Sequence, residues 1–83
     1  MKRAAGIMED QLRAALVSDR RLAGVREPRT RAEGGIAIER PGAREWLWRW
    51  IDGEFQLSIA DSPVVAVETV AEAVRYTREN LAE

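Results

Sequence analysis

The arginines of residues 20–31 are the clearest group of side chains that could bind a ligand. Residues 1–31 hold eight Lys or Arg and four Asp or Glu, whereas residues 32–83 hold five Arg and ten Asp or Glu. Guanidinium groups that neutralise phosphates release counterions, so such a cluster indicates a nucleic-acid interface. Asp19, Glu27 and Glu33 lie among the arginines and dilute their charge. This interpretation is therefore our alternative hypothesis, and its residues are Arg20, Arg21, Arg26, Arg29 and Arg31.

Catalytic groups are scarce in this sequence. The chain has 0 His and 0 Cys, so it lacks imidazole bases and thiolate nucleophiles, and its serines have no histidine to activate them. Glu39 and Glu45 are a candidate acid–base pair, because the predicted strands place them opposite each other. Like charges that face each other across an exposed sheet are more simply unfavourable. We expect a non-enzymatic protein with no cofactor and no metal site.

Three tryptophans, Trp46, Trp48 and Trp50, alternate along the chain just before Asp52-Gly53. Aromatic side chains at this spacing on a sheet either stack on nucleic-acid bases or fill a core. Asp-Gly favours a two-residue type I′ turn, which fixes the register of the flanking strands. That register creates one wholly apolar face, on which Trp50 lies opposite Phe55, Trp48 opposite Leu57 and Trp46 opposite Ile59.

A core role for these tryptophans follows from the size of the chain. A domain of 83 residues buries only roughly 60–65% of the surface that its unfolded chain exposes. A buried aromatic side chain removes about 150–250 Å² from water, and no other fully apolar sheet face is visible in the sequence. We predict that helices cover the tryptophans, and that at least one indole N–H finds a partner or lies at the rim.

The elements before the tryptophans are a helix, a basic connection and a strand. Apolar residues at helical spacing predict a helix from Ile7 to Ala23 that Gly24 ends. A basic connection spans residues 24–34, with at most a short extended piece. Ile36 and Ile38 then predict a strand over residues 34–40, which pairs Ile38 with Trp46 through a three-residue loop at 41–43.

Two interpretations compete for the residues after Asp61. In the first, Ser62 caps a long helix with Pro63 in its first turn. In the second, Val64 to Val67 form a fourth strand and Thr69 begins the helix. We prefer the second, because Thr69 and Glu72 have the spacing of a capping box. The fold class is then α+β: an N-terminal helix, an antiparallel three- to four-stranded β-meander and a C-terminal helix, in a single domain over residues 1–83, with both helices packed on the tryptophan-bearing face.

Our first hypothesis for function is a small non-enzymatic protein-binding module that acts by occupying a surface on another protein. The sheet face opposite the tryptophans would be its contact surface, because it mixes apolar side chains with charge. Edge strands are a second route to partners, and the bipolar charge also fits a self-neutralising homodimer. The residues assigned to this hypothesis are Glu45, Leu47, Arg49, Ile51 and Gln56.

In size and in its lack of catalytic groups, the chain resembles the small inhibitory proteins of phages and mobile elements, anti-CRISPR proteins among them. That resemblance implies inhibition by surface occupation. An antitoxin or immunity protein is a further alternative with the same mechanism and a different target. The sequence lacks the apolar stretch of a secretory signal and any long apolar run, so we expect a cytoplasmic protein without membrane contact.

Overall fold

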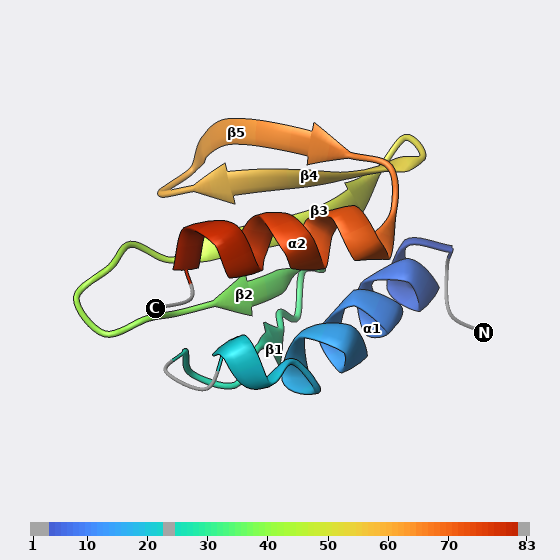
Figure 1. The fold of residues 1–83 in the computed structure, drawn as a ribbon. Coiled ribbons are helices and arrows are strands. Elements are labelled where there is room, and N and C mark those ends of the chain that lie inside the picture. Colours follow the sequence, from blue (N-terminus) through green and yellow to red (C-terminus); the bar gives the residue numbers. More distant parts are fainter. Residues whose placement is uncertain (1–3, 23–24, 82–83) are drawn as a thin grey trace.

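The computed structural model describes residues 4–22 and 25–81, which form an α+β domain with two helices on one face of an antiparallel sheet (Figure 1). The sheet has five strands in the order β1-β2-β3-β4-β5, and each strand is antiparallel to the next along the chain. The predicted fold class is confirmed, with one more strand than expected. The elements are α1 (Ala4–Val17), the 3₁₀ helix η1 (Arg20–Leu22), β1 (Arg29–Thr30), β2 (Ile36–Ile38), β3 (Trp46–Ile51), β4 (Glu54–Ile59), β5 (Ser62–Val67) and α2 (Val70–Leu81).

The β3–β4 hairpin has the turn and the register that the sequence predicts. Asp52 and Gly53 have φ angles of 54° and 80°, as a type I′ turn requires. Trp50 therefore pairs with Phe55, and Trp48 pairs with Leu57. Because side chains alternate between faces, this register sends all three tryptophans to one side of the sheet.

The β2–β3 connection is longer than predicted. Ile38 pairs with Trp46 as expected, but the strands end there, so the loop comprises residues 39–45 rather than 41–43. A tight turn inside the loop brings the Ala43 N–H to the Arg40 carbonyl at 2.9 Å, with Gly42 at a φ of 83°. The loop still has an odd number of residues, so Ile36 and Ile38 project to the same face of the sheet as the tryptophans, as predicted.

A second tight turn joins β4 to β5, and the sequence did not predict it. Ala60 and Asp61 have φ angles of 50° and 66°, which is uncommon for residues other than glycine. β5 begins at Ser62, two residues earlier than predicted. The register shifts between Leu57 and Ser58, which leaves Val64 as the extra residue of a β-bulge.

The cap of α2 confirms the preferred interpretation of the C-terminal region. The Thr69 hydroxyl accepts a hydrogen bond from the Glu72 N–H at 3.1 Å, and it donates to the Glu72 carboxylate at 3.1 Å. At the other end of the helix, the Arg40 guanidinium donates to the Leu81 carbonyl at 3.1 Å. Both ends of α2 are therefore held by side chains.

The N-terminal helix ends earlier than predicted. α1 stops at Val17, where the Ser18 hydroxyl donates to the Ala14 carbonyl at 3.0 Å. The Asp19 carboxylate then accepts the Arg21 N–H at 2.9 Å and opens η1. Serine and aspartate compete for backbone groups in this way and so favour helix ends. The predicted terminator, Gly24, lies outside the described residues.

The tryptophan-bearing face of the sheet, called the covered face below, packs against both helices and forms the core. Trp48 and Phe55 are fully buried, and Trp50 lies half-buried at the rim with its ring edge against Phe55. The Trp48 indole N–H donates to the Thr77 hydroxyl of α2 at 3.0 Å, and that hydroxyl donates to the Ala73 carbonyl at 2.8 Å. The predicted core role and the predicted partner of an indole N–H are both confirmed.

Neither α1 nor α2 could cross a membrane: across residues 4–22 and 25–81, no helix has the required length and apolar character.

Candidate protein-binding face

The face of the sheet opposite the helices, called the open face below, carries the five residues that the sequence assigns to protein binding. Alternate positions of β3 place Leu47, Arg49 and Ile51 on this side, and Gln56 of β4 pairs with Arg49. Glu45 directly precedes β3. The helices α1 and α2 lie on the other side of the sheet (Figure 1). Leu47 and Ile51 are half-buried and Arg49 is exposed. The structure therefore brings the five residues onto one surface.

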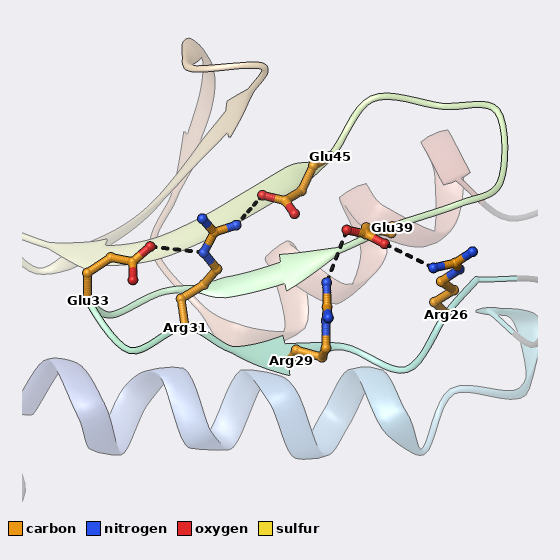
Figure 2. A network of polar contacts seen from close by, with 6 residues as sticks. All are labelled: Arg26, Arg29, Arg31, Glu33, Glu39 and Glu45. Atoms are coloured by element: carbon orange, nitrogen blue, oxygen red, sulfur yellow. Dashed lines mark hydrogen bonds and ion pairs between the residues drawn. The ribbon is translucent and has the colours of Figure 1, made fainter.

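Arginines and glutamates beside β1 and β2 form ion pairs at one end of the open face (Figure 2). Glu39 lies between two of the arginines and accepts hydrogen bonds from Arg29 at 3.0 Å and from Arg26 at 3.5 Å. We call the whole set the arginine–glutamate network, and its members are Arg26, Arg29, Arg31, Glu33, Glu39 and Glu45.

Arg31 is the second centre of this network. Its guanidinium donates to Glu33 at 3.0 Å and also to Glu45. The hydrogen bond to Glu33 and the nearby charge of Glu45 raise the pKa of Arg31. The pKa of Glu33 is lowered, first by its own backbone N–H and then by Arg31. The two charges of this pair hold each other in the ionised form.

Small residues in and beside β2 lie beneath longer side chains on the open face. Ala37 projects to the open face between Arg29 and Leu47, yet only 2% of its surface is exposed. The absence of a side chain at Gly35 leaves room for Arg49 and Leu47 to lie over its backbone, because a Cβ atom there would lie 2.9 Å from atoms of both residues. Long side chains therefore lie flat across this part of the face, instead of extending into water.

The same ion pairs weaken the nucleic-acid hypothesis. Arg26, Arg29 and Arg31 already neutralise carboxylates of this chain, so a phosphate would have to displace them. Arg20 and Arg21 belong to η1, beside the helices and away from the open face (Figure 1). The five arginines therefore do not form one surface, and nucleic-acid binding stays an untested prediction.

The candidate acid–base pair has a different role in the structure. Glu39 and Glu45 are the first and last residues of the β2–β3 loop, so they are not a strand pair as predicted, and each carboxylate accepts hydrogen bonds from arginine. This pairing offsets the repulsion that two acids at neighbouring strand ends would otherwise have. Within residues 4–22 and 25–81, no group of three or more His, Cys, Asp or Glu side chains could hold a metal ion.

Glu9 is an important residue that the sequence analysis missed. Its side chain belongs to α1 and only 6% of the residue is exposed. One carboxylate oxygen accepts the Gly35 N–H at 2.8 Å, and the other accepts the Trp50 N–H at 3.0 Å. In an antiparallel ladder, hydrogen-bonded pairs alternate with non-hydrogen-bonded pairs, so the Trp50 N–H points away from β4 and toward the β2 side of the sheet. No residue of β2 lies opposite Trp50 to accept this hydrogen bond. Glu9 replaces the missing strand partner.

A surface hollow of about 510 Å³ opens between Glu9 and the end of β3. Trp50 and Ile51 supply its apolar wall, and Arg31, Glu33 and Arg49 supply charge at its border. It adjoins the open face through Arg49 and Ile51, so an apolar side chain of a partner could insert there.

Comparisons with models of protein families, with curated proteins and with solved structures found no match for this chain. The inference about function therefore starts from the geometry of the open face.

Proposed function

We propose that this chain is a small non-enzymatic module that binds another protein through its open face and acts by occupying the partner's surface. One observation carries the proposal: Leu47, within the central strand, and Ile51, at the end of that strand, remain half-exposed on a sheet face that neither α1 nor α2 covers. Protein interfaces combine such an apolar centre with a polar rim, and arginine is enriched in them.

The arginine–glutamate network supports this proposal through its order. Arg31 already contacts two carboxylates in the free protein. A side chain that is held in place before binding loses less conformational entropy when the partner arrives. The border of the open face is thus preorganised on the side of β1 and β2.

The class of partner is a folded protein with an exposed apolar patch that accepts Leu47 and Ile51. An inhibitor of the anti-CRISPR type would use such a surface, and an antitoxin or immunity protein would use it in the same way. A second copy of the chain is the remaining alternative. These possibilities share one binding mechanism and differ in the target.

The test compares matched double variants. Leu47→Asp with Arg49→Glu changes the centre of the open face, and Ala71→Asp with Arg75→Glu makes similar changes at exposed positions of α2. The tagged proteins are used to isolate partners from the organism that encodes the chain, and circular dichroism verifies that each variant is folded.

We expect the open-face variant to bind the purified partner at least about tenfold more weakly, a loss of about 1.4 kcal/mol, while the α2 variant binds like the parent. Mass measurement on a sizing column shows whether the partner is a second copy. Unchanged partners and unchanged self-association in the open-face variant would overturn the proposal.

A further inference from the structure

The free edge of the sheet at β5 has the properties of a second binding surface. β5 is the last strand in the sheet order and pairs only with β4. The opposite edge, at β1, is only two residues long, and the Arg13 guanidinium of α1 donates to the Pro28 carbonyl beside it at 3.0 Å. The two edges are therefore unequal, and β5 is the open one.

β5 is also the most exposed apolar part of the sheet. Its sequence, Ser62-Pro-Val-Val-Ala-Val67, contains no charged residue, and all six residues are exposed or half-buried. Val64 has 46% of its surface exposed, the highest value among the large hydrophobic residues of the described strands. Edge strands of soluble proteins are usually protected by charge, so this composition leaves the edge able to pair.

The hydrogen-bond alternation identifies the residue that would bind. The turn at Asp52–Gly53 makes Glu54, Gln56 and Ser58 the residues of β4 that bond to β3, in agreement with the Ala60 N–H donating to the Glu45 carbonyl at 3.4 Å. Phe55 and Leu57 then bond to β5. Ala66 lies opposite Gln56, so its N–H and C=O point away from β4 toward the free edge.

The β5 edge also has a limit on one side. Pro63 pairs with Ser58 in the same alternation, so its nitrogen faces outward and carries no hydrogen to donate. The bulge at Val64 further interrupts pairing there. A strand that adds to β5 would therefore be held around Ala66, in the half of the strand near Val67.

The charge around this edge selects the partner. Along the sequence, five carboxylates and no Lys or Arg occur between Arg49 and Arg75, and they are Asp52, Glu54, Asp61, Glu68 and Glu72. Arg49 itself lies two strands away from Ala66, across Gln56. Asp61 and Glu68 directly flank β5 at its two ends. A second copy of the chain would bring two acidic hairpins together, which like-charge repulsion disfavours. A basic strand would complement them.

We propose that the β5 edge binds an extended, lysine- or arginine-rich segment of another protein by strand addition at Ala66, with the flanking carboxylates selecting its charge. Main-chain hydrogen bonds supply the binding in this mode, and the side chains supply selectivity. The surface is separate from the centre of the open face, so this inference does not depend on the function proposed above.

The experiment is a titration of the ¹⁵N-labelled full chain, followed by NMR, with two synthetic nonapeptides. One alternates lysine with threonine, and the other has glutamate in place of lysine. We expect the lysine peptide to shift the amide signals of Val65, Ala66 and Val67 and to protect the Ala66 amide from hydrogen exchange. The glutamate peptide should have neither effect.

Two variants test the mechanism and the charge separately. Ala66→Pro removes the outward N–H and leaves the hydrogen bonds to β4 in place. We expect it to weaken binding of the lysine peptide at least about tenfold. Glu54→Lys with Glu68→Lys should weaken binding of the lysine peptide to a similar degree and should increase binding of the glutamate peptide. Glu79→Lys, an exposed change on α2, is the control and should have no effect.

The inference is overturned if both peptides bind equally, or if the lysine peptide shifts the amide signals of Leu47 and Ile51 instead of those of β5. It is also overturned if the β5 signals shift with protein concentration alone, because that result means that a second copy of the chain occupies the edge. Protection of the Ala66 amide decides the outcome even if Ala66→Pro fails to fold. Leu47→Ala with Ile51→Ala changes the apolar residues of the open face without changing its charge and should leave peptide binding unchanged, which separates a failure here from a failure of the function proposed for the open face.

Discussion

Leu47 and Trp48 are neighbours in β3, but their side chains project to opposite faces and are held by different forces. On the covered face, Trp48 is fully buried under α2 and forms one hydrogen bond, to Thr77. On the open face, Leu47 is half-buried beside residues that are held by ion pairs. Burial of large apolar groups contributes several kcal/mol per side chain, whereas exposed ion pairs contribute little.

This contrast would separate stability from the proposed binding in the same sheet. The covered face must keep its shape for the domain to fold, because a small domain has few other core residues. We expect the exposed side chains of the open face, unlike the buried Ala37 beneath them, to tolerate change with little loss of stability. A sheet of this kind can present a variable surface on a constant support.

The largest expected effect tests the contrast at these two neighbours. Trp48→Ala should lower the free energy of unfolding by about 3–5 kcal/mol, because it leaves a cavity in the core. Leu47→Ala should lower it by only about 1 kcal/mol, because half of the side chain is already in water. Urea denaturation followed by circular dichroism measures both values, and equal losses would contradict the assignment of the two faces.

A smaller effect is expected at Glu9, whose buried carboxylate joins α1 to the sheet. Glu9→Ala should lower the free energy of unfolding by about 1–3 kcal/mol, because it leaves the N–H groups of Gly35 and Trp50 without their acceptor. Glu9→Gln keeps one carbonyl oxygen and should lose less. Thermal melts rank the stability of these variants. A larger loss of stability in Glu9→Ala than in Leu47→Ala would strengthen the contrast between the covered face and the open face.

The smallest expected effect concerns an ion pair on the helix side, between Asp19 and Arg78 at 2.8 Å. Burial by itself raises the pKa of Asp19, but hydrogen bonds from Arg78 and from the Arg21 backbone outweigh it, so the pKa lies below its ordinary value of 3.8. The contribution of Asp19 to stability is then complete above that ordinary value. It is lost as the pH falls through the lowered pKa of the folded protein.

Asp19→Asn provides the comparison for this pH dependence. The parent should be more stable than Asp19→Asn at pH 7, and the difference should shrink as denaturant melts are repeated at decreasing pH below about 4. Raising the salt concentration should reduce this difference less than it reduces the effect of Glu45→Gln, whose partner Arg31 is on the open face. A difference that grows in acid would contradict the assigned direction of the pKa.

Most of the fold could be predicted because a few residues have specific backbone requirements. Asp52-Gly53 fixed the β3–β4 register, and Thr69 with Glu72 fixed the start of α2. The turn at Ala60–Asp61 could not be predicted in the same way, because alanine seldom adopts a positive φ. The surrounding pairs, Ile59 with Ser62 and Glu45 with Ala60, impose that conformation from outside the turn.

The candidate site was predictable in its placement and not in its contacts. Alternation along the predicted strand is enough to place Leu47, Arg49 and Ile51 on one face. The pairing of Arg31 with Glu45 depended on β1, whose two residues give no periodic signal. Glu9 did leave a signal that we did not use, since it lies three positions before Leu12 and seven before Leu16, on the same side of α1.

The two hydrogen bonds of Glu9 join three segments through a single carboxylate. Movement of α1 away from the sheet releases the amides of Gly35 and Trp50 together. Detachment of the helix and opening of this corner of the sheet are therefore one cooperative event, and amide exchange at the two positions should report the same opening free energy.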